Sequence, residues 1–193
     1  MQESQEMKMQ IKIIFTFISV LSLLFFSGNA LAVDGITGVA IKNFSYNLVA
    51  ADRTVQLKNG KYKSGNNPDN FICVKLVKYA IGDLNGDGVN DAVIVLAQNF
   101  MGSGTFFELT ALEVKDGKIH QTKSISLGDR VVIKDLAISK TDNEHQISNA
   151  NKIKLKMITH KATDPSCCPS LKVEKCFYLT SPDLKEYLRE CYE

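Results

Sequence analysis

Short segments rich in Val, Ile, Leu and aromatic residues recur along most of the chain, and Gly, Asn and Asp separate them. In residues 151–160, NKIKLKMITH, Lys alternates with Ile, Leu and Met, so one face of a strand would be apolar and the other polar. The apolar run AVIVLA, residues 92–97, is bounded by turn residues and is typical of a central strand. The same reasoning predicts further strands at residues 71–81, 105–114, 118–126, 131–139 and 171–179.

The Asn59-Gly60 pair lies between two further short segments, residues 54–58 and 61–63. Asn-Gly favours a type I′ turn, so the sequence predicts a β-hairpin here. Many short strands at regular spacing indicate an antiparallel sheet of the β-meander type. The predicted fold is therefore all-β, with the sheet either closed into a barrel or folded into two layers.

Helical periodicity is confined to the end of the chain. Ser181-Pro182-Asp183 offers an N-cap followed by Pro at the first helical position. Leu184, Leu188 and Cys191 would then lie on one face of the helix. The sequence predicts a short C-terminal helix after the last strand.

Composition and charge narrow the class of protein. The 193 residues are 45% hydrophobic and 23% charged, which is typical of a globular protein and excludes a disordered or collagenous one. Lys and Arg total 23 against 21 Asp and Glu, a net charge of +2 without a basic run. This charge gives no electrostatic basis for a nucleic-acid partner.

The first residues have the pattern of a secretory signal. Lys8 and Lys12 are basic, residues 13–26 form an apolar run, and Ala30-Leu31-Ala32 ends the segment with small residues around the cleavage position. The alternative is a transmembrane anchor, but a span needs about 20 apolar residues, and this run is shorter. We therefore expect residues 1–32 to be cleaved after Ala32, and residues 33–193 to form one periplasmic or secreted domain without a transmembrane segment.

The strongest chemical signal is GDLNGDGVND, residues 82–91. Alternating oxygen-bearing residues in a tight loop converge on one centre, and the closely packed carboxylates would repel one another without a divalent cation. Ca²⁺ is favoured over Mg²⁺, which keeps more of its water ligands. The expected ligands are the side chains of Asp83, Asn85, Asp87 and Asp91 and the backbone carbonyl of Val89.

The loop begins like an EF-hand but does not continue as one. The twelfth position is Ile94, where an EF-hand has a bidentate Glu, and the following segment is a predicted strand. Residues 81–96 instead resemble the strand-flanked calcium loop D-x-[DN]-x-D-G-x-x-D of FG-GAP repeats, as in integrin α-type propellers. That resemblance implies the same five ligands. A propeller repeats its blade, whereas this chain has one such loop, so the propeller architecture is not expected.

A second group of polar residues is expected at the opposite end of a simple meander. It comprises the Gly102-Ser103-Gly104 loop, Asp129, Arg130, His160, Asp164 and the Cys167-Cys168-Pro169 turn. Three interpretations compete: a Cys nucleophile with His160 as base, a His/Cys metal site, and a loop closed by a disulfide. The metal site lacks the usual two-residue spacing of its cysteines, and the third interpretation, a Pro-bounded loop closed by a disulfide, is favoured.

The five cysteines are at positions 73, 167, 168, 176 and 191. An odd number in an exported protein leaves at least one thiol free or bonded to another molecule. Pairing of Cys176 with Cys191 is the first expectation, and pairing of Cys73 with Cys167 or Cys168 is the second. A vicinal bond between Cys167 and Cys168 is the alternative.

The segments GDLNGDGVNDAVIVLAQN, GSGTFFEL, SLGDRV and THKATDPSCCPS are together similar to exported bacterial proteins of the LppP/LprE type. The resemblance spans residues 78–179 and implies a cell-envelope location without supplying a reaction. Such proteins often carry a lipid-attachment Cys at the cleavage site, and this chain has Val33 there.

The sequence therefore predicts an exported calcium-binding β-domain with a binding or envelope-structural role and an unidentified envelope partner. The chain has no serine nucleophile elbow, His-Glu-x-x-His, P-loop or dinucleotide motif, so an enzyme is the less favoured interpretation. Two alternatives stay open. One is a hydrolase or thiol enzyme that uses Cys167, Cys168 and His160, and the other is a calcium-dependent adhesion module.

Overall fold

The computed structural model describes residues 35–140 and 151–187. The chain divides into Met1–Ala32 and Val33–Glu193, and the described residues all belong to the second unit. The predicted signal peptide and its cleavage site lie outside the described residues. In the part of the chain that is described, no helix has the length and apolar character needed to cross a membrane.

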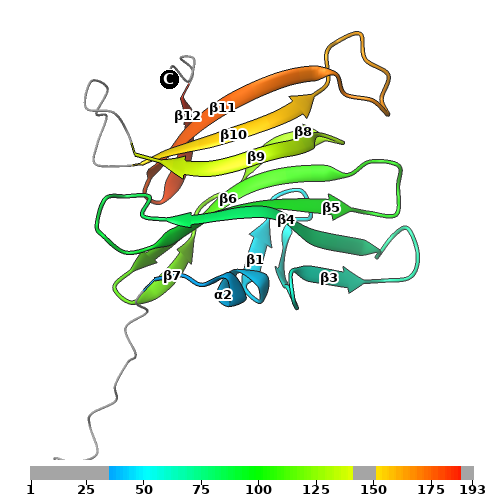
Figure 1. Cartoon of the computed structure of the whole chain (residues 1–193). Coiled ribbons are helices and arrows are strands. Elements are labelled where there is room, and N and C mark those ends of the chain that lie inside the picture. Colours follow the sequence, from blue (N-terminus) through cyan, green and yellow to red (C-terminus); the bar gives the residue numbers. More distant parts are fainter. Residues whose placement is uncertain (1–34, 141–150, 188–193) are drawn as a thin grey trace, which may run out of the picture. The chain divides into compact units, whose positions relative to one another are not determined.

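The described elements are one short helix and twelve strands (Figure 1). They are α2 (Gly38–Lys42), β1 (Ser45–Leu48), β2 (Arg53–Gln56), β3 (Lys61–Ser64), β4 (Ile72–Gly82), β5 (Asp91–Asn99), β6 (Phe106–Lys115), β7 (Lys118–Gln121), β8 (Ile125–Asp129), β9 (Val132–Ser139), β10 (Lys152–Thr159), β11 (Leu171–Thr180) and β12 (Asp183–Tyr187).

The strands form three antiparallel sheets. The largest has the order β3-β4-β5-β6-β7, and β8 also pairs with β6. The second has the order β12-β11-β10-β9, and β1 pairs with β2 in a separate hairpin. The prediction of a mostly antiparallel all-β fold is confirmed, and the described strands do not close into a barrel.

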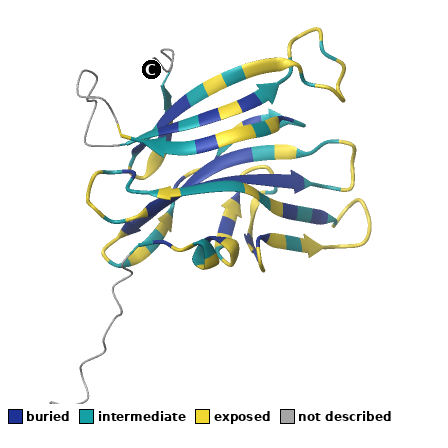
Figure 2. Ribbon diagram, in the orientation of Figure 1, coloured by how far each residue is buried: buried dark blue, intermediate teal, exposed yellow. Residues whose placement is uncertain are grey.

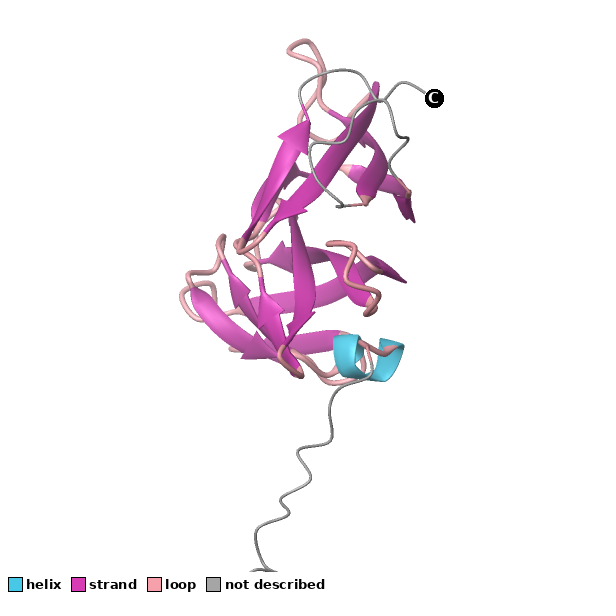
Figure 3. Cartoon of the chain, turned by 90° about the vertical axis from the view of Figure 1, so that its left-hand side faces the viewer, coloured by secondary structure: helices cyan, strands magenta, loops and turns pink. Residues whose placement is uncertain are grey.

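The central strands of the largest sheet, β5 and β6, are buried on both faces. Ile94, Leu96 and Leu112 belong to a core cluster with residues of α2, β1 and β2. Val93 and Val95, which point the other way, belong to a second cluster with residues of β10 and β11. Figure 1 shows this arrangement, with α2 and β1 on one side of the β4–β6 strands and β9–β12 on the other. In the turned view of Figure 3, the helix lies at one end of the stacked strands.

Strand β5 is the central strand that the AVIVLA run predicts. Every residue from Asp91 to Gln98 is buried, because core clusters cover both faces of the strand (Figure 2). The alternation in β10 is also confirmed. Ile153, Leu155 and Met157 are buried in the core cluster between the two sheets.

Two predicted local structures are wrong in part. Asn59 and Gly60 have φ values of 51° and 78°, as a type I′ turn requires, and Lys58 and Lys61 form the bridge across it. The flanking strands nevertheless pair elsewhere, β2 with β1 and β3 with β4. The predicted single strand at residues 118–126 is divided between β7 and the start of β8.

The predicted C-terminal helix is a strand in its described part. β12 pairs with β11, so that Leu184 lies opposite Leu179 and both side chains are buried. Backbone pairing with a neighbouring strand therefore outweighs the local helix-capping signal. Leu188 and Cys191, the other members of the predicted helical face, lie outside the described residues.

Candidate functional site

The acidic loop, residues 83–90, joins β4 to β5 and folds around Asp83. The Asp83 carboxylate accepts hydrogen bonds from the backbone N–H groups of Gly86 at 2.6 Å and Gly88 at 2.9 Å. Both glycines have positive φ, 82° and 85°, which a side chain would disfavour. The alternation of Gly with polar residues therefore produces a tight turn with a carboxylate at its centre.

Asn85 and Asp87 continue the same local pattern. Asn85 Oδ1 accepts from the Asp87 N–H at 3.0 Å, and Asp87 Oδ1 accepts from the Val89 N–H at 2.8 Å. The Asn85 amide nitrogen donates to Asp87 Oδ2 at 3.0 Å and to Glu113 Oε1 at 3.3 Å. The partly positive amide group thus lies between two carboxylates.

Asp91 begins β5 and is completely buried. Its Oδ2 accepts from the Leu84 N–H at 3.0 Å and its Oδ1 from the Val114 N–H at 2.8 Å. Burial raises the pKa of Asp91 to about 6, and the negative charges of Asp87 and Glu113 contribute in the same direction, although the two backbone hydrogen bonds oppose the shift. Asp91 therefore connects the acidic loop to β6 and still carries an unfavourable buried charge.

Glu113 belongs to this site although the sequence did not predict it. It lies on β6, is 95% buried, and its Oε2 accepts from Ser181 Oγ at 2.7 Å. In the β5–β6 register, Ala92 pairs with Leu112. Glu113 is the next residue of β6, so it lies level with the start of β5. In the sequence, the only sign of its role is a Glu within a mostly apolar strand. The strand register is needed to show that this side chain contacts the acidic loop.

The acidic loop is also attached to the second sheet. Asn151, which precedes β10, donates from its side chain to the Asp83 carbonyl at 2.7 Å and from its backbone to the Leu84 carbonyl at 3.0 Å. Leu84 is fully buried in the core cluster between the two sheets. On the other side, the Asn90 carbonyl accepts from the Ile36 N–H at 2.8 Å. The loop therefore contacts segments from three parts of the chain.

The structure brings Asp83, Asn85, Asp87 and Asp91 into one hydrogen-bonded loop and places Val89 within it. These groups are all oxygen donors, which suits a hard cation such as Ca²⁺. Among the described residues, however, no three His, Cys, Asp or Glu side chains converge in a metal-binding geometry. Both Asp91 oxygens accept backbone hydrogen bonds, so part of the donor set is already engaged in holding the loop.

The predicted polar end of the meander consists of two separate groups. In one, Asp129 binds Arg130 at 2.6 Å and accepts from the Thr105 N–H at 2.7 Å, beside the Gly-Ser-Gly loop. The other is the cysteine loop, residues 160–170, between β10 and β11. Of the hydrogen bonds and ion pairs between described residues, none joins His160 to either Cys167 or Cys168.

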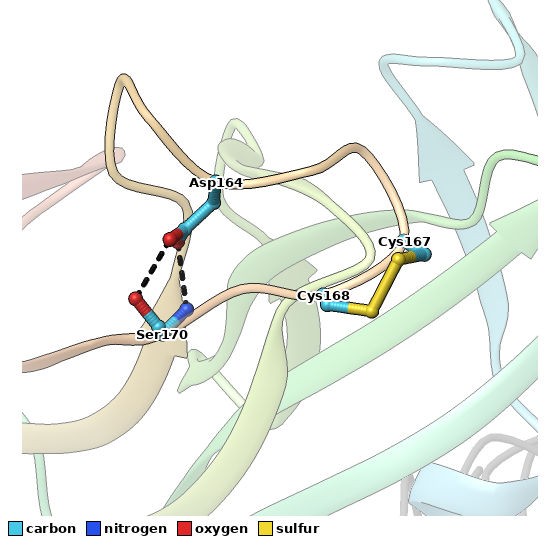
Figure 4. The surroundings of a disulfide bond; sticks show 4 residues. All are labelled: Asp164, Cys167, Cys168 and Ser170. Carbon is cyan, nitrogen blue, oxygen red and sulfur yellow. Dashed lines mark hydrogen bonds between the residues drawn. A yellow bond between two sulfur atoms is a disulfide. The ribbon is translucent and has the colours of Figure 1, made fainter.

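The cysteine loop contains a disulfide between Cys167 and Cys168 (Figure 4). The expected pairing of Cys73 with one of them is wrong, because Cys73 is a free thiol on β4, between Lys63 of β3 and Asn99 of β5. The expected pairing of Cys176 with Cys191 involves a residue outside the described part of the chain and stays a prediction.

Comparisons with family models, curated proteins and solved structures find no match to this chain.

Proposed function

We propose that this chain is an exported β-domain that binds one Ca²⁺ at the acidic loop, and that the ion stabilises the fold. The protein then serves a binding or envelope-structural role and does not itself catalyse a reaction. The export proposal is supported by the basic start, the apolar run and the Ala-Leu-Ala ending of residues 1–32. The ion proposal is supported by the environment of Asp91.

Within the described part of the chain, the carboxylates around the acidic loop have no cationic side-chain partner. Asp83, Asp87, Asp91 and Glu113 take part in none of the ion pairs formed by residues 35–140 and 151–187. Asp91 and Glu113 are at least 95% buried, where an uncompensated charge is costly. The burial of Asp91 and Glu113 without a cationic partner among the described residues is the single observation that carries the proposal. Burial is the main cause of the raised pKa of Asp91, to which the charges of Asp87 and Glu113 add, and a divalent cation would offset the cost of these buried charges.

The ligand set is the one that the sequence predicts, with Glu113 added. Asp83, Asn85, Asp87, the Val89 carbonyl and Asp91 would supply oxygens from the loop, and Glu113 would supply one from β6. The Asn85 amide nitrogen now lies between Asp87 and Glu113, so a cation at this point requires the amide to turn its oxygen inward. A bound ion would then hold the β4–β5 loop against β6.

The test is thermal unfolding of the purified protein after chelation, with Ca²⁺ or Mg²⁺ added back. At free Ca²⁺ about a hundredfold above the dissociation constant, linkage gives about 2.7 kcal/mol of stabilisation. For a domain of this size that corresponds to a rise in Tm of roughly 5–10 °C. The rise should be specific for Ca²⁺ and absent in Asp87→Asn.

Asp69→Asn is the matched control. Asp69 is an exposed acid in the loop before β4, at the opposite end of that strand from the acidic loop. This variant should respond to Ca²⁺ as the wild type does. Equal responses of Asp87→Asn and wild type, or no response in either, would contradict the proposed ion site.

The same titration separates the structural role from adhesion. A structural ion raises Tm without changing the molecular mass in solution, whereas an adhesion module associates when Ca²⁺ is added. Sedimentation velocity with and without Ca²⁺ distinguishes the two.

The thiol-nucleophile alternative requires a free thiol, and both cysteines concerned are bonded to each other. Cell fractionation tests the proposed export.

A further inference from the structure

The disulfide of the cysteine loop joins neighbouring residues and therefore encloses no chain segment. The Cα atoms of Cys167 and Cys168 are 3.8 Å apart, the ordinary separation across one trans peptide bond. A disulfide stabilises a fold mainly by closing a loop in the unfolded chain, and this effect grows with loop length. Because no residues lie between the two cysteines, their bond cannot serve as a staple between distant segments.

A different residue holds the cysteine loop together. The Asp164 carboxylate accepts hydrogen bonds from the Ser170 N–H and the Ser170 hydroxyl, each at 2.8 Å (Figure 4). It also accepts from the Lys161 N–H at 2.8 Å. These bonds join the two ends of the loop next to β10 and β11. They hold the pKa of Asp164 below its usual value, with the Lys161 backbone hydrogen bond as the largest cause. Loop closure is thus independent of the disulfide.

The bonded cysteines are also accessible. Cys167, Cys168 and their neighbours Pro165 and Ser166 are all exposed. Cys176, by contrast, is 99% buried in β11. A disulfide that encloses no segment and lies in an exposed, separately held loop is open to attack by a thiolate of another molecule.

We propose that the Cys167–Cys168 bond is a thiol–disulfide exchange site that accepts two electrons from a partner protein bearing a closely spaced pair of reduced cysteines. The partner's first thiolate attacks one sulfur, which forms a mixed disulfide, and the other cysteine leaves as a thiolate and takes up a proton. The partner's second thiol loses its proton and attacks the partner's own sulfur in the mixed disulfide. The partner becomes oxidised, and the second cysteine of this chain is released and protonated.

The adjacency of the cysteines selects a dithiol over a single thiol. After a monothiol attacks, the released cysteine stays one peptide bond from the mixed disulfide and displaces the monothiol at high effective concentration. A dithiol carries its own second thiol, which competes with this reversal and completes the reduction. This proposal does not depend on the calcium site.

The experiment treats the purified, oxidised protein with reduced thioredoxin as the dithiol probe and with glutathione as the monothiol. Free thiols are alkylated, and the protein is digested with trypsin. Cleavage after Lys161 and Lys172 yields the peptide ATDPSCCPSLK, in which Cys167 and Cys168 are the only cysteines. Thioredoxin should give the doubly alkylated peptide, glutathione at equal thiol concentration should give less of it, and Tm should change by less than about 2 °C.

A thioredoxin variant without its second cysteine should trap the mixed disulfide as a covalent adduct. The double variant Cys167→Ser/Cys168→Ser retains the cysteines at positions 73, 176 and 191 and should form no adduct, while its Tm stays within about 2 °C of the wild type. The proposal is overturned if the bond is reduced only in denaturant, if the adduct persists in the double variant, or if reduction of this bond unfolds the protein.

Discussion

Ser181 donates a hydrogen bond from Oγ to Glu113 Oε2 at 2.7 Å, across 68 positions of the sequence. Ser181 lies in the turn between β11 and β12, and Glu113 lies on β6. Through its other oxygen Glu113 contacts Asn85 of the acidic loop. One carboxylate therefore connects the proposed calcium site to the last described hairpin of the chain.

Replacement of Glu113 should weaken calcium binding more than it affects folding. Glu113→Gln keeps the size of the side chain and removes its charge, so we expect a loss of about tenfold in Ca²⁺ affinity, equivalent to about 1.4 kcal/mol. Isothermal titration calorimetry measures the affinity directly. Glu174→Gln, which removes a partly exposed carboxylate paired with Lys156, is the control and should bind Ca²⁺ as the wild type does.

Loss of the Asp91 carboxylate should destabilise the protein even when chelator is present. Asp91→Ala leaves the N–H groups of Leu84 and Val114 without acceptors at a buried position, which costs about 2–5 kcal/mol in the free energy of unfolding. Urea unfolding in EDTA measures this loss. Asp87→Ala, at an exposed position, should cost less than about 1 kcal/mol. Equal losses in the two variants would show that Asp91 does not hold the loop.

Glu108 should make the stability depend on pH. It is 98% buried on β6, and its Oε2 accepts from the Val49 N–H at 3.2 Å. Burial raises the pKa of Glu108 above its unfolded value. A carboxyl group whose pKa is higher in the folded than in the unfolded state stabilises the fold at pH values below its unfolded pKa. This stabilisation is lost as the pH rises through the pKa of the folded state.

The pH prediction is checked by urea unfolding of wild type and Glu108→Gln in chelator, from pH 4.5 upward. The neutral Gln cannot ionise, so the free energy of unfolding of the wild type should fall relative to that of the variant as pH increases. Parallel curves for the two proteins would mean that Glu108 does not titrate differently in the folded and unfolded states.

Removal of the Asp164 carboxylate should loosen the cysteine loop without affecting the calcium response. Asp164→Ala deletes the three hydrogen bonds to Lys161 and Ser170, so trypsin should cleave after Lys161 faster than in the wild type. Limited proteolysis followed by mass spectrometry measures the rate. Unchanged cleavage would show that another contact closes the loop.

The same loop should open at low pH. Because the pKa of Asp164 is lowered in the folded protein, the stability that it provides is present above its unfolded pKa and lost as pH falls through the folded value. Opening is followed by hydrogen exchange of the Ser170 amide. The protection factor, which is the intrinsic exchange rate at each pH divided by the observed rate, should fall in the wild type as the loop opens. This acid-induced loss of protection should be absent in Asp164→Ala, whose loop is already open at neutral pH.

The sequence predicts best those elements whose pattern has a local cause. β5 is predictable from its continuous apolar run, because a strand that is buried on both faces needs apolar residues at every position. β10 is predictable from the alternation of Lys with apolar residues, because only one face of that strand is buried. The Asn59-Gly60 turn is also predictable, since positive φ at both positions favours these residues. The turn does not determine which strands pair beside it, because pairing depends on segments distant in sequence.

The C-terminal segment and Glu113 show what local patterns miss. Ser181-Pro182-Asp183 favours a helix start, yet Leu184 is buried by pairing β12 with β11. The acidic loop is recognisable from its spacing, whereas Glu113 reaches it only through the β5–β6 register. Side chains supplied by a neighbouring strand cannot be assigned to a site before that register is known.

Strand β5 contributes alternate side chains to both hydrophobic clusters, with Val93 and Val95 in one and Ile94 and Leu96 in the other. Unfolding of either cluster would displace β5 and so disrupt the packing of the other cluster as well. The two clusters should therefore melt as one cooperative unit. Because Asp91 is the first residue of this strand, an ion that secures the acidic loop would raise the melting temperature of both clusters together.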